Sequence, residues 1–193
     1  MAAEDTRHSG NLLRHYQIER PLVSYHAHNE ARRTEELLEK LRAGSTVALV
    51  TDAGMPCISD PGHRLLKACR LHGIPYSVLP GPSSVLTALV GSGFPPDRFT
   101  FGGFLPTKSG QRERELLAAN AREETSIYFE SPYRLVRTLE TCAAHFPERP
   151  VCVARELTKQ FEEFRCGPAP ELLAHFAQKT VKGEIVFLVS GRG

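Results

Sequence analysis

Residues 46–73, "TVALVTDAGMPCISDPGHRLLKACRLHG", contain the pattern that decides the fold. The apolar run 46–50 is typical of a strand that is buried on both faces. Residues 63–73 have the apolar spacing of a helix that ends at Gly73. An acidic loop rich in glycine and proline joins the two. In open α/β sheets, ligands bind at such a passage from a strand to a helix.

The rest of the chain repeats this alternation of apolar strands and amphipathic helices, which predicts an α/β protein. We expect strands at 21–26, 46–52, 75–81, 126–131, 151–158, 161–166 and 183–189, and helices at 31–44, 63–73, 82–93, 111–124, 133–146 and 171–180. No helix separates strands 151–158 and 161–166, so we expect them to pair antiparallel in a mixed sheet. Near Phe99 an aromatic, glycine-rich segment gives way to a basic one. We therefore predict two domains, 1–101 and 102–193, with a ligand cleft between them.

The composition is that of a globular protein. Of 193 residues, 41% are hydrophobic and 24% are charged, and the net charge is +2. This charge makes no strong case for nucleic acid at the level of the whole chain, although arginine, the commoner basic residue, suits contacts to phosphate or carboxylate. No signal peptide or membrane-spanning run is visible, so we expect a cytoplasmic protein. The five cysteines include no CxxC pair, which predicts free thiols and neither a disulfide nor a zinc site. They are Cys57, Cys69, Cys142, Cys152 and Cys166.

The acidic loop is unsuited to phosphate, because it carries carboxylates and matches neither GxxxxGK nor GxGxxG. A carboxylate at the end of a strand, such as Asp52, suits ribose hydroxyls, an amine or a metal. Gly54 allows a ligand to approach the backbone, and Pro56 stiffens the loop. Asp60 is a favoured residue type for the N-cap of the following helix.

A second loop of the same kind, "LPGPSS" at 79–84, places Ser83 and Ser84 at the start of a helix. They can cap that helix or bind a polar group of a ligand. Charged residues also gather in the N-terminal segment and at the ends of two later strands. These residues are Glu4, Asp5, Arg7 and His8, and then Glu130, Arg134, Arg155, Glu156 and Lys159. The N-terminal group suits either acid–base chemistry or a salt-bridged helix start.

Eight segments occur in an order that resembles one group of enzymes. They are "AEDTR", "SYHAHNE", "TDAGMPCISDPG", "LPGPSS", "GFLP", "YFESPYR", "ARELTK" and "KGE". The chain is similar to the tetrapyrrole methylase superfamily, and within it to enzymes that methylate the ribose 2′-hydroxyl of a cytidine in small-subunit ribosomal RNA. The resemblance implies two α/β domains with S-adenosylmethionine in the cleft between them, a mainly parallel N-terminal sheet and a mixed C-terminal sheet. It also implies a homodimer.

The resemblance assigns roles to particular residues. Those implied to bind the cofactor are Asp52, Ala53, Gly54, Pro56, Ser83, Ser84, Phe129, Ala154, Gly183, Glu184 and Ile185. Because a positioned base speeds removal of the hydroxyl proton, we look for a catalytic base among Glu4, Asp5 and Glu130. Candidates for holding RNA are Arg7, His8, Lys108, Arg134, Arg155 and Lys159. No metal is expected.

Members of this group begin with an apolar strand and a Pro-Ile-Gly-Asn-type loop ahead of "AEDTR", and many continue past the last strand into a helical tail. This chain starts at Met1 and stops after "SGRG". We therefore expect a chain truncated at both ends, with unpaired sheet edges and exposed apolar surface.

Three other interpretations stay open. The chain could methylate a small tetrapyrrole, whose carboxylates would suit arginines near the cleft. It could be a catalytically impaired remnant that binds RNA or a protein partner. A metal-dependent hydrolase using Asp52 and Asp60 is disfavoured, because no further acidic ligands lie nearby in the sequence.

Overall fold

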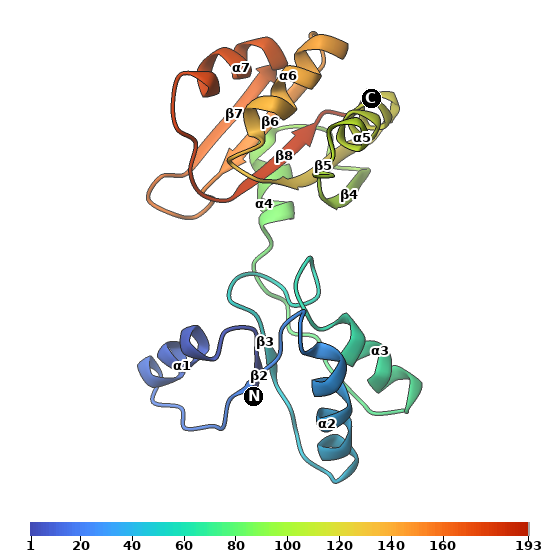
Figure 1. The fold of residues 1–193 in the computed structure, drawn as a ribbon, viewed down its shortest axis with the longest axis vertical. Helices are drawn as coiled ribbons and strands as arrows, with labels where there is room; N and C mark the ends of the chain where they lie inside the picture. The colour runs from blue at the N-terminus through green and yellow to red at the C-terminus, as the bar shows by residue number, and fades with distance from the viewer. Residues whose placement is uncertain (193) are drawn as a thin grey trace. The chain divides into compact units, whose positions relative to one another are not determined.

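The fold, drawn in Figure 1, comes from a computed structural model that describes residues 1–192. The chain divides into two compact units, residues 1–83 and the part that starts at Ser84. Each unit contains a sheet and helices, so the predicted α/β class is confirmed. No helix within residues 1–192 combines the length and the apolar character needed to cross a membrane.

The first unit is built on a parallel sheet with the strand order β2–β1–β3. The central strand β1 (Ala2–Ala3) pairs with β2 (Val23–Ser24) on one side and with β3 (Leu49–Val50) on the other. The helices of this unit are α1 (Thr6–His15), α2 (Glu30–Arg42) and α3 (His63–Leu71). Its core consists of Ala2, Tyr25, Leu37, Leu38, Leu65 and Cys69.

Glycines end or begin the helices of the first unit. Gly44, with a φ of 86°, follows α2, and Gly73, with a φ of 64°, follows α3, as the sequence predicted. The prediction that Asp60 is the N-cap of α3 is wrong, because Gly62 holds that position with a φ of 138°. A Cβ atom on Gly62 would lie 2.7 Å from Cys57 Sγ and from Leu49 Cδ2. The chain therefore enters α3 through a passage that only glycine fits.

The strand predicted at 75–81 is absent: the structure has no strand in this segment. Its apolar side chains are exposed instead, by 49% at Tyr76, 60% at Val78 and 82% at Leu79. A strand needs a neighbour that pairs with its backbone, and no strand among residues 1–192 pairs with this segment. Residues 75–81 therefore contribute exposed apolar side chains in place of the predicted strand.

The second unit is built on a mixed sheet with the order β4–β5–β8–β6–β7. The strands are β4 (Phe99–Phe104), β5 (Thr125–Glu130), β6 (Pro150–Arg155), β7 (Glu163–Pro168) and β8 (Ile185–Val189). The helices are α4 (Ser84–Ser92), α5 (Ser109–Ala121), α6 (Leu135–His145) and α7 (Ala169–Ala177). β4 and β5 are parallel, and the other pairs are antiparallel, including β6 with β7 as predicted.

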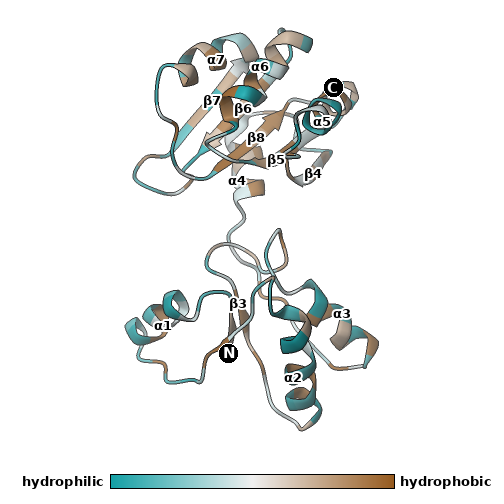
Figure 2. Cartoon of the chain, in the orientation of Figure 1, coloured by the Kyte–Doolittle hydropathy of each residue, from teal (hydrophilic) through white to brown (hydrophobic). Residues whose placement is uncertain are grey.

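Two apolar clusters cover the two faces of this sheet. On one face, Val85, Ala88 and Leu89 of α4 pack against alternate residues of β5, β6 and β8. On the other face, α5, α6 and α7 contribute Leu116, Leu139 and Phe176, among others, to the larger cluster. Figure 2 shows the result as hydrophobic colouring along β6 and β8, in contrast to the hydrophilic surface of α2. The continuous apolar run of β8 reflects burial on both faces.

The division between the units lies earlier in the chain than the boundary expected near residue 101. Helix α4 belongs to the second unit because it packs on β5, β6, β7 and β8, and β4 belongs there because it pairs with β5. The segment that forms β4 is rich in glycine, and for this reason it was not predicted as a strand. A Cβ atom on Gly102 would lie 2.4 Å from the Tyr128 ring, so glycine allows the close approach of these neighbours.

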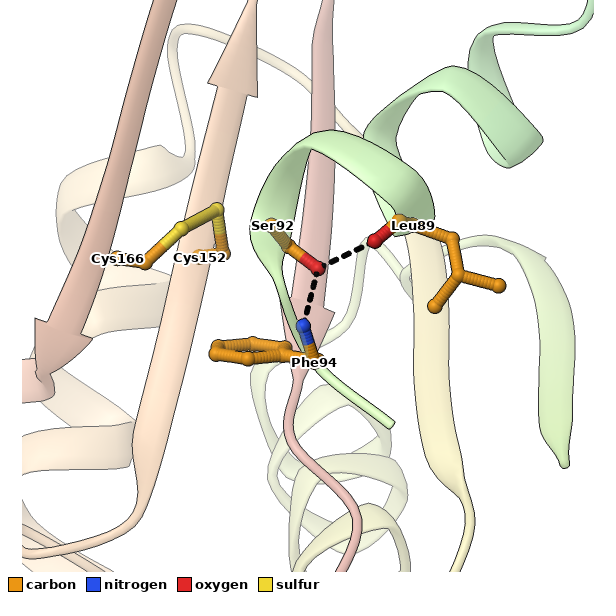
Figure 3. The surroundings of a disulfide bond; sticks show 5 residues. All are labelled: Leu89, Ser92, Phe94, Cys152 and Cys166. Atoms are coloured by element: carbon orange, nitrogen blue, oxygen red, sulfur yellow. Dashed lines mark hydrogen bonds between the residues drawn. A yellow bond between two sulfur atoms is a disulfide. The ribbon is translucent and has the colours of Figure 1, made fainter. Parts of the chain in front are cut away.

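The prediction that all five cysteines are free thiols is wrong for one pair. Cys152 of β6 and Cys166 of β7 are directly opposite each other and form a disulfide, which Figure 3 shows beside the end of α4. There Ser92 Oγ donates to the Leu89 carbonyl and accepts from the Phe94 amide. Direct pairing of the two cysteines depends on the register of the strands, which cysteine spacing alone does not reveal. Cys57, Cys69 and Cys142 are free.

Candidate functional site

The candidate site begins at the carboxyl edge of the parallel sheet in the first unit. β1 and β3 end side by side, and the Glu4 amide donates to the Val50 carbonyl at 3.3 Å. The Thr51 hydroxyl lies 2.7 Å from Glu4 Oε2 and 2.8 Å from Asp60 Oδ2. Two carboxylates from distant parts of the chain therefore meet at one hydroxyl, at the edge where open α/β sheets bind ligands.

The Thr51 hydroxyl has a single hydrogen, so it donates to only one of the two carboxylates at a time. The other carboxylate then faces the lone pairs of the same oxygen. An ionised carboxylate has about four lone-pair sites on its two oxygens, so Glu4 can accept from a further donor in either case. This arrangement suits proton removal from a nearby ligand.

The acidic loop continues from this point with an unusual backbone. Gly54 has a φ of 75°, and the non-glycine residues Cys57 and Ser59 have φ values of 72° and 63°. Glycine adopts such a conformation without strain, but in other residues it costs about 1–3 kcal/mol and is found most often at functional sites. The Asp52 amide lies 3.5 Å from Glu4 Oε2, while the exposed Asp52 carboxylate accepts no hydrogen bond from residues 1–192. Asp52 is thus an open acceptor beside the Glu4 carboxylate.

The structure brings the second predicted cofactor loop, 79–84, against the first. A Cβ atom on Gly54 would lie 3.6 Å from the Pro82 carbonyl oxygen, and one on Gly81 would lie 3.0 Å from Met55 Sδ. Ser83 ends this loop, and Ser84 begins α4. The contact is ordinary van der Waals packing at Gly54 and tighter at Gly81, so the two predicted ligand loops lie against each other.

A third group at this edge had no role assigned from the sequence. Asn29 Oδ1 accepts from the His26 amide at 2.9 Å, so its Nδ2 faces the Ser24 carbonyl and His26 Nε2. His26 Nε2 therefore accepts, and the proton of a neutral ring is on Nδ1. His26 Nδ1 is buried and has no partner in the described part of the chain. The "SYHAHNE" segment was the available signal for these residues, and the polar end of β3 was the signal for Thr51.

Of the three predicted bases, two have structural roles. Asp5 caps α1 by accepting from the Arg7 amide at 2.8 Å and also pairs with the Arg7 guanidinium. The side chain and the amide of Arg7 hold the pKa of Asp5 well below its ordinary value, which makes this carboxylate a weak base. Glu130 is fully buried and accepts from the Ser131 amide, the Thr138 hydroxyl and the Arg134 guanidinium. Of the three candidates for the catalytic base, Glu4 therefore remains.

Residues predicted to line the adenine side meet at one end of the sheet in the second unit. Phe129 of β5 and Ala154 of β6 both pair with Val186 of β8, next to Ile185. Ala154 and Ile185 are buried in different clusters, on opposite faces of the sheet. Only Phe129 is partly exposed, and its ring packs edge-on against Phe101 at 5.0 Å. Phe129 can therefore contact a ligand through its side chain, whereas Ala154 and Ile185 can do so only through their backbone.

The loops on either side of this point are tied together. The Glu156 carboxylate accepts from the Glu184 amide at 3.0 Å and from Lys159 at 2.9 Å, and Lys159 also pairs with Glu184. Gly183 has a φ of 90°, and a Cβ atom there would lie 2.4 Å from the Glu156 side chain. Glu156 has a φ of 50°. The predicted cofactor residues Gly183 and Glu184 are thus held by a strained, charged loop.

The predicted RNA-binding residues differ in whether their side chains are exposed and unpaired. His8 and Lys108 are exposed, and Arg7 is exposed but paired with Asp5. Arg134 donates to the Leu105 carbonyl and pairs with Glu130. Arg155 donates to the Lys182 carbonyl and pairs with Glu163. The side chains of Arg134 and Arg155 are only 19% and 17% exposed, so their charges are paired within the second unit and are not available to a ligand.

Glu163 couples the stability of the second unit to pH. Burial alone would raise its pKa, but hydrogen bonds from His175, Lys179 and Arg155 outweigh burial and lower the pKa from 4.5 to about 2. The resulting stabilisation, about 3 kcal/mol, is present above pH 4.5 and is lost as the pH falls toward 2. We expect Glu163→Gln to destabilise the unit at pH 7 and to weaken the pH dependence of its unfolding between these limits. Denaturant unfolding at several pH values measures both effects, and an unchanged dependence in the variant would contradict this assignment.

The described part of the chain has no cluster of side chains suited to a metal ion. Residues 1–192 contain no group of three or more His, Cys, Asp or Glu side chains that could hold a metal ion. The rings of His26 and His28 lie 5.9 Å apart, edge to face. The carboxyl-edge site is therefore described by its carboxylates, hydroxyl and backbone alone.

A parallel sheet whose carboxyl edge carries an acidic, glycine-containing loop, together with a second unit of mixed sheet, defines a class of two-unit α/β proteins. The chain belongs to the family of tetrapyrrole (corrin/porphyrin) methylases, which matches residues 2–173. Membership in this family makes methyl transfer the reaction class of the chain.

Three curated relatives carry the name ribosomal RNA small subunit methyltransferase I. The Synechocystis protein is 46% identical over 192 residues, which are 99% of this chain and 69% of the relative. The Escherichia coli O157:H7 protein is 47% identical over 99% of this chain and 68% of its own length. The Thermotoga maritima protein is 44% identical over 98% of this chain and 85% of its own length.

Solved structures support the fold. The methyltransferase CobJ superposes with a TM-score of 0.65 at 18% identity and covers 98% of this chain and 92% of its own. Diphthine synthase superposes with a TM-score of 0.67 at 15% identity and covers 94% and 73% of the two chains. At these identities the likeness concerns the fold alone, and the predicted tetrapyrrole methylase fold is confirmed.

Proposed function

We propose that this chain methylates the ribose 2′-hydroxyl of a cytidine in small-subunit ribosomal RNA and uses S-adenosylmethionine as the methyl donor. The observation that carries the proposal is identity of 44–47% to three relatives named for the small-subunit RNA, over nearly the whole chain. The family supplies the reaction class. The alternative of a tetrapyrrole substrate has weaker support, because the CobJ structure is only 18% identical.

The residues of the carboxyl edge fit the proposed donor. S-adenosylmethionine carries ribose hydroxyls, an ammonium and a carboxylate, and it supplies an activated methyl group on a sulfonium. The open Asp52 carboxylate suits the hydroxyls or the ammonium. The loops at 52–56 and 79–84 lie against each other, so one ligand could contact both.

The chain itself would align the ribose and remove its proton. Glu4 is the proposed base, because its carboxylate lies at the carboxyl edge beside the Thr51 hydroxyl, whereas Asp5 caps a helix and Glu130 is fully buried in an ion pair. Thr51 would position Glu4 from the end of β3. Alignment of the hydroxyl with the methyl group would account for much of the remaining acceleration.

We also propose that the chain acts in the cytoplasm, because its proposed substrate belongs to the ribosome. A homodimer stays a prediction from the resemblance, since the described residues belong to one chain. Light scattering of the purified chain measures the oligomeric state directly.

The proposal is tested by labelled methyl transfer from S-adenosylmethionine to small ribosomal subunits, to naked small-subunit RNA and to a porphyrinoid precursor. We expect label in the RNA, at one cytidine, as a nucleotide that resists alkaline hydrolysis at its 3′ phosphodiester. Transfer to the porphyrinoid alone would overturn the substrate assignment.

Asp52→Asn tests the donor site. Loss of a charge-assisted hydrogen bond costs about 1.5–3 kcal/mol, so the Kd for S-adenosylmethionine in calorimetric titration should rise about 10-fold to 100-fold. Asp97→Asn removes another exposed carboxylate and serves as the control, with the Kd expected to stay constant. Equal affinity of Asp52→Asn and the original chain would exclude this role of Asp52.

A further inference from the structure

A cluster of basic side chains surrounds a single carboxylate beside the edge strand β7. Glu163 Oε2 accepts from Arg155 Nε and Nη2, while Glu163 Oε1 lies 3.4 Å from Arg165 Nε, 2.9 Å from His175 Nε2 and 3.2 Å from Lys179 Nζ. β7 supplies Glu163 and Arg165, β6 supplies Arg155, and His175 lies in α7. We call Arg155, Glu163, Arg165, His175 and Lys179 the β7 cluster.

The charges of this cluster do not balance. Arg155, Arg165 and Lys179 are cations with one carboxylate among them, so the cluster has a net charge of +2 when His175 is neutral. His175 Nε2 lies 2.9 Å from Glu163 Oε1 and 2.7 Å from Lys179 Nζ. One ring nitrogen cannot donate to Glu163 and accept from Lys179 at the same time. The cluster therefore has more donors than its one carboxylate needs.

The surplus donors lie on the outer side of the cluster. Arg155 and Glu163 are 17% and 18% exposed, whereas Arg165 is 52% exposed and Lys179 is 39% exposed. Within residues 1–192 only Nε of Arg165 has a partner, so its two terminal nitrogens are available as donors to a ligand. The inner pair therefore holds the outer cations in place, at the edge of the sheet where no further strand pairs with β7.

We propose that Arg165 and Lys179 bind the phosphodiester backbone of the RNA substrate. The proposal rests on the proposed function and adds a contact surface to it. Arginine forks match phosphate oxygens, and lysine adds a point charge. A duplex or single strand offers closely spaced phosphates, which a surface with two or three cations can neutralise together. Arg155 and Glu163 position this surface and do not touch the RNA.

The double variant Arg165→Gln/Lys179→Gln tests the surface. Binding of a small-subunit RNA fragment is measured by fluorescence anisotropy between 50 and 300 mM KCl. Each lost phosphate contact lowers the slope of log K against log salt by about 0.7–0.9, so we expect a decrease of about 1.4–1.8. The Kd at 100 mM KCl should rise about 10-fold or more. Titration with S-adenosylmethionine and thermal unfolding report whether the variant is folded.

Lys67→Gln/Arg70→Gln is the matched control, because it removes the same two charges from exposed positions of α3. An equal loss of RNA affinity in the control would reduce the effect to net charge and overturn the proposal. Competition by poly-aspartate as strong as that by RNA would identify a general anion surface and would also overturn it. Methyl transfer by the unsubstituted chain distinguishes failure of this inference from failure of the proposed function. If transfer to RNA occurs while the slope of the double variant is unchanged, only this inference fails, whereas no transfer to RNA contradicts the proposed function.

Discussion

Replacing Glu4 with glutamine should lower the rate constant of methyl transfer by about 10²–10⁴-fold, the usual contribution of a positioned base. Glutamine keeps an oxygen that can accept from the Thr51 hydroxyl, so the end of β3 stays in place. The variant loses only the ability to take a proton. Single-turnover transfer at saturating cofactor and RNA measures the chemical step directly.

Asp60→Asn is the control for Glu4→Gln, because Asp60 meets the same hydroxyl from the acidic loop. It should retain most of the rate if Glu4 is the base. A Glu4→Gln variant that keeps its rate constant and shows only a higher KM for RNA would assign Glu4 to binding.

Removing the Glu130 carboxylate should destabilise the second unit by about 3–5 kcal/mol, the cost of leaving one partner of a buried ion pair alone. Glu130 is fully buried, and its loss leaves the Arg134 guanidinium, 19% exposed, without its carboxylate partner. The Ser131 amide and the Thr138 hydroxyl lose their acceptor as well. Since the chain has no Trp, unfolding of Glu130→Leu in urea is best followed by circular dichroism.

A double-mutant cycle separates the ion pair from its surroundings. Glu130→Leu combined with Arg134→Met should be less destabilised than the sum of the two single variants, because neither charge is then left unpaired. Additive losses would show that the pair makes no net contribution. Glu130→Gln should transfer methyl groups at nearly the original rate per folded molecule. A large loss of rate with an intact fold would return Glu130 to the candidates for the base.

Local sequence patterns correctly predicted the features that are determined within one short stretch of the chain. The absence of a helix between residues 158 and 161 predicted the antiparallel pairing of β6 with β7, and Gly44 and Gly73 predicted the ends of two helices. Patterns failed where the outcome depends on a neighbour. Residues 75–81 alternate like a strand but have no pairing partner, and the disulfide depends on the register between two strands.

The candidate site shows the same limit. The loops at 52–56 and 79–84 were predicted as ligand loops, and the structure places them in contact. Sequence alone could not distinguish an open charge from a paired one. Asp5, Arg134 and Arg155 have the residue types of a functional site, yet each is paired within its own unit. The roles of Thr51 and His26 depend on contacts between segments that are distant in the sequence.

The two sheets differ in a way that bears on motion. Each strand of the parallel sheet has two residues, while the strands of the mixed sheet have five or six. The short ladder has few backbone hydrogen bonds to break, so the loops at its carboxyl edge can open locally at a much lower free energy than the centre of β8. A ligand that binds there would therefore also act as a clamp that suppresses these openings. The part of the chain that carries the proposed chemistry is thus the part most able to adapt to its substrate.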